Sequence, residues 1–122
     1  MPRVLDIALG DPAIGGALIA GHFGGYFKIA TEELGQRECA AARELALVVK
    51  RRGKPVIVHT IYGAEPLTAL EPLRAAGIPI YRSLEASARA MGALWQHAQA
   101  PGSPAGRAGR RSPPDRSRGS RP

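Results

Sequence analysis

The chain has 122 residues, with 17 Lys and Arg residues against 10 Asp and Glu residues, for a formal net charge of +7. That length excludes two catalytic domains and leaves room for one small domain. The single cysteine, Cys39, excludes an intramolecular disulfide and a zinc site built from several cysteines. Because no basic segment precedes an uninterrupted apolar stretch at the N-terminus, we expect no secretory signal. Residues 13–27 are too short and too rich in glycine to span a bilayer, and the single thiol is compatible with the cytoplasmic location that we predict.

The positive charge is concentrated at the C-terminal end. Residues 101–122 hold six arginines and one acid, Asp115, and they contain no Val, Ile, Leu, Met, Phe, Tyr or Trp. Such a segment buries too little apolar area to offset the entropy of ordering, so we predict a folded body over residues 1–100 and a disordered tail over 101–122. The arginines would contact nucleic-acid phosphates weakly. Since no aromatic side chain is present to stack on bases, we favour a solubilising tail, or a GC-rich reading frame read past its stop or shifted, over nucleic-acid recognition.

The first half of the body predicts a helix, a strand and a long helix. A helix ending at Gly10 precedes an apolar run over residues 17–23 that is typical of a buried parallel strand. After a turn at residues 24–26, apolar positions at three- and four-residue spacing predict a helix over residues 31–52. Gly35 weakens its first turn and moves the expected start toward residue 36. We interpret the acidic residues of this helix as a solvated face: Glu32, Glu33, Glu38 and Glu44.

The second half predicts a strand, a short helix, a short strand and a final helix. Residues 55–62 are rich in β-branched side chains, as expected for a buried strand. The helix over residues 67–76 is expected to be short or kinked, because proline in a helix interior costs about 3 kcal/mol. A strand over 78–81 lies near an edge because of its proline, and Ser83 caps the last helix. The apolar stripe of that helix is Leu84, Ala88, Met91, Trp95 and Ala98, and we assign Met91 and Trp95 to the core or to an interface.

This alternation predicts an α/β domain with a parallel sheet and right-handed crossovers. Three strands are few for four helices, because the usual sheet has five or six. The chain also opens on a helix rather than on a strand. We therefore expect that leading strands are missing and that residues 1–100 form only part of a domain.

Three sequence blocks in the predicted order carry a family resemblance. They are Gly24-Gly25-Tyr26-Phe27 after the first strand, Gly53-Lys54-Pro55-Val56-Ile57-Val58 leading the second, and residues 73–85, from a helix end through Gly77 to the Ser83 cap. Together they resemble the succinyl-CoA-ligase-like, flavodoxin-like domain of NDP-forming acyl-CoA synthetases, the family of ADP-forming acetate–CoA ligases. The resemblance implies an incomplete flavodoxin-like, three-layer parallel sheet. It also implies a parent enzyme that uses CoA and ATP or ADP.

The sequence departs from that family at the catalytic segment. Family members carry a phosphohistidine in a Gly-His-Ala-Gly-like segment after the Lys-Pro-Val strand, whereas only residues 63–66 stand between Tyr62 and Leu67 here. The CoA-binding fingerprint and the ATP-grasp lobes are absent too. The resemblance therefore implies a non-catalytic scaffold or fragment that binds no cofactor alone, is inactive alone, and docks CoA-binding and ATP-grasp domains or subunits. The alternatives are a small stand-alone α/β module that binds a ligand or dimerises through an open sheet edge, and, more weakly, nucleic-acid association through the tail.

Ligands of open parallel sheets bind beyond the carboxyl ends of the strands. Histidines there could take phosphate or shuttle protons, and amides beside glycines could cradle an anion. We favour a structural role, in which the histidines bond loop backbone and the glycines form a tight turn, because no carboxylate in the same local motif orients either histidine. We predict no catalytic residue and no metal ligand. The ligand-binding candidates at these strand ends are His22, Gly24, Gly25, Tyr26, His59, Thr60 and Tyr62.

Overall fold

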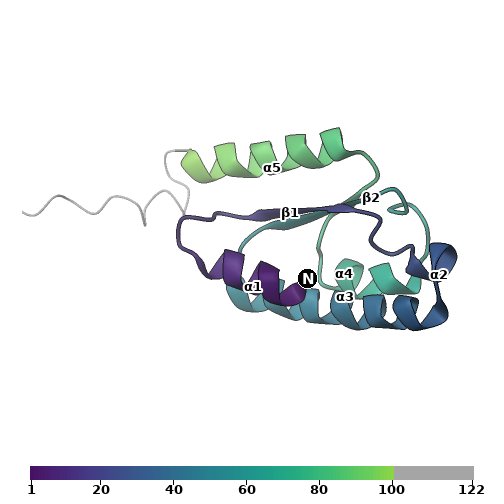
Figure 1. Ribbon diagram of the computed structural model, residues 1–122. Helices are drawn as coiled ribbons and strands as arrows, with labels where there is room; N and C mark the ends of the chain where they lie inside the picture. The colour runs from purple at the N-terminus through teal and green to yellow at the C-terminus, as the bar shows by residue number, and fades with distance from the viewer. Residues whose placement is uncertain (101–122) are drawn as a thin grey trace, which may run out of the picture.

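The computed structural model describes residues 1–100, and the predicted tail, 101–122, lies outside the described residues. The described part has three layers (Figure 1). Helices α1 (Pro2–Gly10), α3 (Glu32–Arg52) and α4 (Glu71–Ala75) lie on one side of the sheet, and α5 (Leu84–Gln99) lies alone on the other. The sequence-based prediction of an α/β sandwich of helices around a sheet is confirmed.

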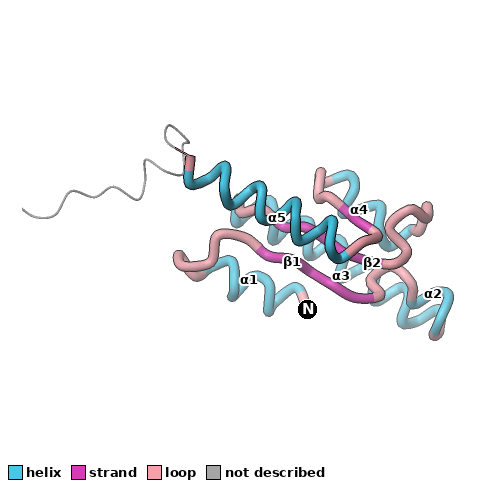
Figure 2. The backbone as a smooth tube through the Cα atoms, turned by 90° about the horizontal axis from the view of Figure 1, so that it is seen from above, coloured by secondary structure: helices cyan, strands magenta, loops and turns pink. Residues whose placement is uncertain are grey.

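The sheet contains three parallel strands in the spatial order β1-β2-β3. These are β1 (Ala17–Gly21), β2 (Val56–Thr60) and β3 (Ile80–Tyr81), and Figure 2 shows them side by side from above. In a doubly wound sheet of flavodoxin-like order 2-1-3-4-5, the last three strands are neighbours in chain order. The arrangement thus matches the second half of such a sheet, as expected for an incomplete flavodoxin-like fold.

The hydrophobic core lies between the sheet and the three-helix layer. Val56 and Val58 of β2 point into this layer, and Ile19 of β1 and Ile80 of β3 pack against it. Because side chains alternate along a strand, the intervening residues of β2 face α5 instead. The fully buried leucines that meet the strands from the helices are Leu9, Leu45, Leu70 and Leu73.

Helix α3 begins earlier than the sequence suggested. The Thr31 hydroxyl accepts a hydrogen bond from the Leu34 N–H, which caps the helix before Glu32. The predicted delay to residue 36 is therefore wrong. Gly35 is buried in the first turn, where a Cβ would overlap the ring of Phe27, so the glycine serves packing between α2 (Tyr26–Ile29) and α3.

A cluster of charges joins the start of the chain to the end of α3. The Asp6 carboxylate accepts a hydrogen bond from Arg52 Nε and pairs with an Arg51 guanidinium nitrogen, both at 2.7 Å. These hydrogen bonds, first from Arg52 and then from Arg51, lower the pKa of Asp6 to about 2. The contact fixes the C-terminal end of α3 against α1.

The expected short helix after β2 is divided in two. A 3-10 turn, η1 (Thr68–Leu70), leads directly into α4, so Pro72 lies in the first turn of α4. N–H groups in a first turn have no partner within the helix, so the missing N–H of proline costs no helical hydrogen bond there. The strand β3 has only two residues and lies at the edge, as its proline suggested.

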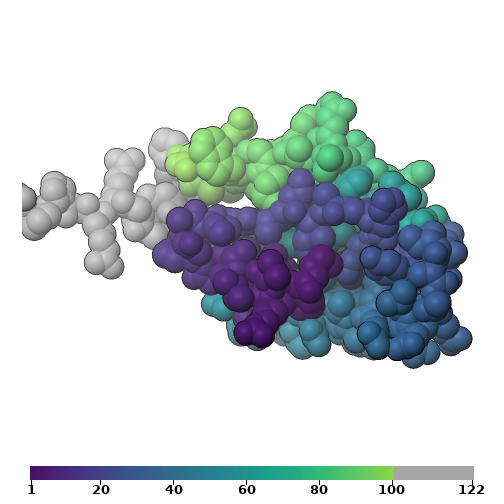
Figure 3. Space-filling view, viewed as in Figure 1, coloured from purple at the N-terminus to yellow at the C-terminus, as the bar shows by residue number. Residues whose placement is uncertain are grey.

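The apolar stripe of α5 is not part of a closed core. Ser83 caps the helix as predicted, by accepting a hydrogen bond from the Ala86 N–H. However, Ser87 is the only fully buried residue of α5, and Trp95 is 64% exposed. Of the two roles predicted for Trp95, core or interface, the structure excludes the core, because α5 is the single described helix on its face of the sheet. In the space-filling view, α5 forms a separate green ridge above the sheet (Figure 3).

Candidate functional site

The carboxyl end of β1 presents backbone amides to a buried carboxylate. Glu38 Oε1 accepts a hydrogen bond from the Gly24 N–H at 2.6 Å, and Oε2 accepts one from the Tyr26 N–H at 3.1 Å. Glu38 is only 4% exposed. Bonds from an N–H to an ionised carboxylate are stronger than those to a neutral acceptor. The amides that we considered as a binding site for an anion therefore already bind a carboxylate of the protein itself.

The assignment of Glu38 to a solvated helix face is wrong. The residue lies on the buried stripe of α3, because residues 38, 42, 45 and 49 follow one another at spacings of four, three and four. Ala42 and Leu45 on that stripe are buried. This periodicity was the available signal that Glu38 points inward, and a buried carboxylate requires hydrogen-bond donors such as the loop amides.

Thr60 joins the two loops that follow β1 and β2. Its side chain is fully buried, and Oγ1 donates a hydrogen bond to the Phe23 carbonyl oxygen at 2.6 Å. The same oxygen accepts a hydrogen bond from the Tyr62 N–H at 3.3 Å. The hydroxyl thus makes two bonds within the fold and stabilises the strand ends as a unit.

Tyr62 closes the glycine turn from the side. A Cβ on Gly25 would overlap the Tyr62 ring, so the ring lies directly against the Gly25 backbone. Lys28 Nζ is 5.7 Å from the centre of the same ring, within the range of a cation–π contact. The doublet Gly24-Gly25 is therefore a packing turn, in which Gly24 has a φ of 96° and Gly25 lies against an aromatic ring.

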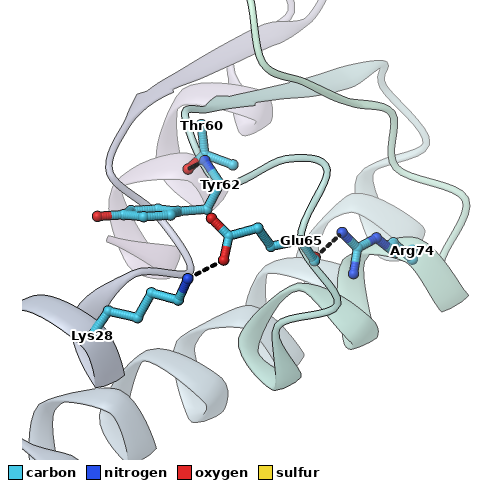
Figure 4. Close-up of polar contacts among 5 residues, drawn as sticks. All are labelled: Lys28, Thr60, Tyr62, Glu65 and Arg74. Atoms are coloured by element: carbon cyan, nitrogen blue, oxygen red, sulfur yellow. Dashed lines mark hydrogen bonds and ion pairs between the residues drawn. The ribbon is translucent and has the colours of Figure 1, made fainter.

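The loop after β2 is held to the helices by charged side chains (Figure 4). Lys28 of α2 forms an ion pair with the Glu65 carboxylate. Arg74 of α4 donates hydrogen bonds to the backbone oxygens of Gly63 at 3.1 Å and Glu65 at 2.7 Å. These contacts hold residues 63–65 in place.

The structure does not bring the two histidines together. His22 is exposed and lines a hollow of about 480 Å³ with Tyr26, Ile19 and Glu38. His59 is not among the residues that line this hollow. It alternates with Val58 and Thr60 along β2 and so faces α5.

His59 lies in a different environment from the loop site. In register it stands between Ala20 of β1 and Tyr81 of β3. Its Nδ1 atom is buried and has no hydrogen-bond partner within the described residues. The favoured interpretation, in which His59 bonds loop backbone, is therefore not supported at Nδ1.

Of the seven candidates, five belong to one linked structure around Glu38. Gly24, Gly25, Tyr26, Thr60 and Tyr62 are connected through backbone amides, a hydroxyl and a ring contact. His22 lies at the rim of the hollow, and His59 lies apart. Most groups that could bind an anion or move a proton here already have partners in the protein.

Residues 1–100 hold no group of three or more His, Cys, Asp and Glu side chains suited to a metal ion. Over the same residues, every helix is too short or too polar to cross a bilayer. Comparison of the chain with models of protein families, with curated proteins and with solved structures yielded no match.

Proposed function

We propose that this chain is a non-catalytic scaffold domain of the NDP-forming acyl-CoA synthetase type. The proposal is supported mainly by one observation: the Gly24 and Tyr26 N–H groups already donate hydrogen bonds to the Glu38 carboxylate. In a domain that binds a phosphate or a carboxylate at its strand ends, such amides would face the ligand. Here they stabilise the fold instead.

The residues next to this loop support the same function. The Thr60 hydroxyl is committed to the Phe23 carbonyl and the Tyr62 N–H, and Cys39 is buried in α3. The blocks at residues 24–27, 53–58 and 73–85 resemble the acyl-CoA synthetase domain, but no segment corresponds to its phosphohistidine. A scaffold that positions CoA-binding and ATP-grasp partners fits both observations.

The first experiment is an activity and binding assay on the purified 122-residue chain. With acetate, CoA and ATP, we expect no formation of acyl-CoA or ADP, and no heat of binding for CoA or ATP alone. Turnover would overturn the non-catalytic role.

The family assignment needs its own test. The DNA upstream of the Met1 codon and the neighbouring reading frames are expected to encode a CoA-binding Rossmann domain or an ATP-grasp protein. A co-purifying complex that forms acyl-CoA only when this chain is present would support the scaffold. An active partner pair that needs no such chain would refute it.

A stand-alone binding module is the second candidate, and the hollow beside His22 favours it. The hollow has a volume of about 480 Å³ and is lined mainly by apolar residues, including Ile19 and Leu34. Screening small apolar acids by chemical-shift changes at His22 and Tyr26 separates the candidates. Saturable shifts at both residues would favour the module over the scaffold.

A further inference from the structure

Strand β1 has an edge that pairs with no other strand of the described residues. Among the described residues it pairs only with β2, and its five residues, Ala17–Gly21, carry no charge and no proline. The Ala17 N–H bonds the Pro55 carbonyl oxygen, so the N–H and C=O groups of Leu18 and Ala20 point away from β2. Proteins normally protect free edges with charges, proline or bulges. An uncharged edge such as this one is typical of a strand that is paired when the protein functions.

Helix α1 extends beneath the space next to this edge. Figure 2 shows α1 beyond β1, on the side away from β2, and Figure 1 shows it in the layer of α3. Val4 on this helix is 70% exposed. The hollow of about 480 Å³ is bounded by Met1, which directly precedes α1, by residues 19–21 of β1 and by Leu34 of α3. Helix α1 therefore forms a floor beneath this space, and no described strand lies above it.

The opposite face of the sheet has a matching gap. A groove of about 810 Å³ runs beside α5 and is lined by Leu18, Met91, Leu94 and Trp95. Gly15 and Gly16 also line it; a Cβ on Gly15 would meet no atom within 4 Å, whereas Gly16 already packs against the Pro55 backbone. Doubly wound sheets carry helices on both faces, whereas α5 is the only described helix on this face (Figure 1).

We propose that the β1 edge and the α5 groove together bind a strand–helix unit of a second, different polypeptide. Its strand extends the sheet parallel to β1, above α1, and its helix lies in the groove beside α5. The partner strand is uncharged and β-branched, because both of its faces become buried. The partner helix places an apolar stripe on Leu18 and Trp95.

Two other occupants fit less well. A second copy paired antiparallel along this edge, with its helix layers on the same faces, would bring its own α1 beneath β1, into the space that the first α1 already occupies (Figure 2). Residues 101–122 contain no large apolar side chain with which to fill the groove. The inference does not depend on the acyl-CoA assignment, since it rests on the edge, the floor and the groove.

The test uses the full 122-residue chain and a synthetic peptide. The peptide joins a Val- and Ile-rich strand to an amphipathic helix, and the control peptide carries the same helix without the strand. We expect saturable binding that slows amide exchange at Leu18 and Ala20 and shifts the Trp95 emission to shorter wavelength. The control peptide should bind at least about tenfold more weakly, a difference of about 1.4 kcal/mol.

Two variants at one position give a matched pair. Ala20→Pro removes an N–H that points away from β2, so the β1–β2 ladder survives while docking weakens about tenfold or more. Ala20→Val keeps the N–H and should retain binding, and circular dichroism checks the fold of both. The proposal is overturned by an absence of saturable binding, or by binding that leaves the exchange of the two amides unchanged. It is also overturned if light scattering shows a dimer of the chain alone in which these amides are already protected.

Discussion

Replacing Glu38 with glutamine tests whether the buried carboxylate holds the strand-end loop. The two side chains have nearly the same shape, so Glu38→Gln creates no cavity. The carbonyl oxygen of glutamine can still accept the Gly24 N–H, now at 2.6 Å from Glu38 Oε1. The amide nitrogen, however, replaces the acceptor of the Tyr26 N–H and brings two donors face to face.

The size of the effect follows from these bonds. A hydrogen bond to a charged group contributes about 1.5–3 kcal/mol, and a buried donor left unpaired costs about 1–3 kcal/mol. The variant avoids burying a charge, which offsets part of the loss. We expect the free energy of unfolding to fall by about 2 kcal/mol, which lowers the Tm by about 10 °C in a domain of this size.

Urea unfolding followed by circular dichroism measures the change, and Glu33→Gln provides the control. Glu33 lies on the same helix, is exposed and, among the described residues, pairs only with Arg37 at i,i+4, so its loss should cost less than about 0.5 kcal/mol. Amide exchange at Gly24 and Tyr26 should quicken in the Glu38 variant alone. Equal unfolding free energies for the two variants would refute the structural role of the Glu38 carboxylate. They would also remove the main support for the view that the loop amides serve the fold rather than a ligand.

Three further predictions concern other parts of the fold. Thr60→Val should lower the free energy of unfolding by about 2 kcal/mol, because it leaves the Phe23 carbonyl and the Tyr62 N–H unpaired. Thr60→Ser keeps the hydroxyl and should cost about 1 kcal/mol for one buried methyl group. Equal losses of stability in the two variants would contradict the role of the hydroxyl. Gly25→Ala should destabilise the fold by about 1–3 kcal/mol, because the added Cβ overlaps the Tyr62 ring. Gly92→Ala lies in an open part of α5 and should stabilise the fold by about 0.5–1 kcal/mol. If thermal unfolding showed that both variants change the stability in the same direction, the packing argument would be refuted. Because the pKa of Asp6 is lowered from 3.8 to about 2, its ion pairs contribute stability above pH 4 that is lost as the pH falls toward 2; acid titration of Asp6→Asn should lack this loss.

Local patterns in the sequence were enough to predict most of the elements. The β-branched run that forms β2 and the polar caps Thr31 and Ser83 act over a few residues, so their consequences can be worked out without a structure. The parallel order followed from the alternation of helix and strand. Pro72 was misjudged only in position, because the 3-10 turn before α4 places it in a first turn.

The candidate site depended on contacts between distant parts of the chain. Glu38 bonds Gly24 and Tyr26 across 14 and 12 residues, and Thr60 reaches Phe23 across 37. Helical spacing could place Glu38 on the buried stripe, but no local pattern identifies the donors that it meets. The strand ends could be predicted as a meeting point, while their internal pairing could not.

The exposure of Trp95 and the burial of Glu38 are two results of one packing arrangement. Three helices share the face of the sheet that contains the core, so a carboxylate on α3 lies deep enough to need the loop amides as partners. Of the described helices only α5 lies on the other face, and Trp95, which the helical pattern assigns to a core or to an interface, remains 64% exposed. Burying a large aromatic side chain is worth more than about 1.5 kcal/mol. A partner that covers Trp95 therefore gains free energy without breaking the hydrogen bonds between Glu38 and the strand-end loop. We therefore place the proposed partner along the β1 edge and the α5 groove rather than at the strand ends.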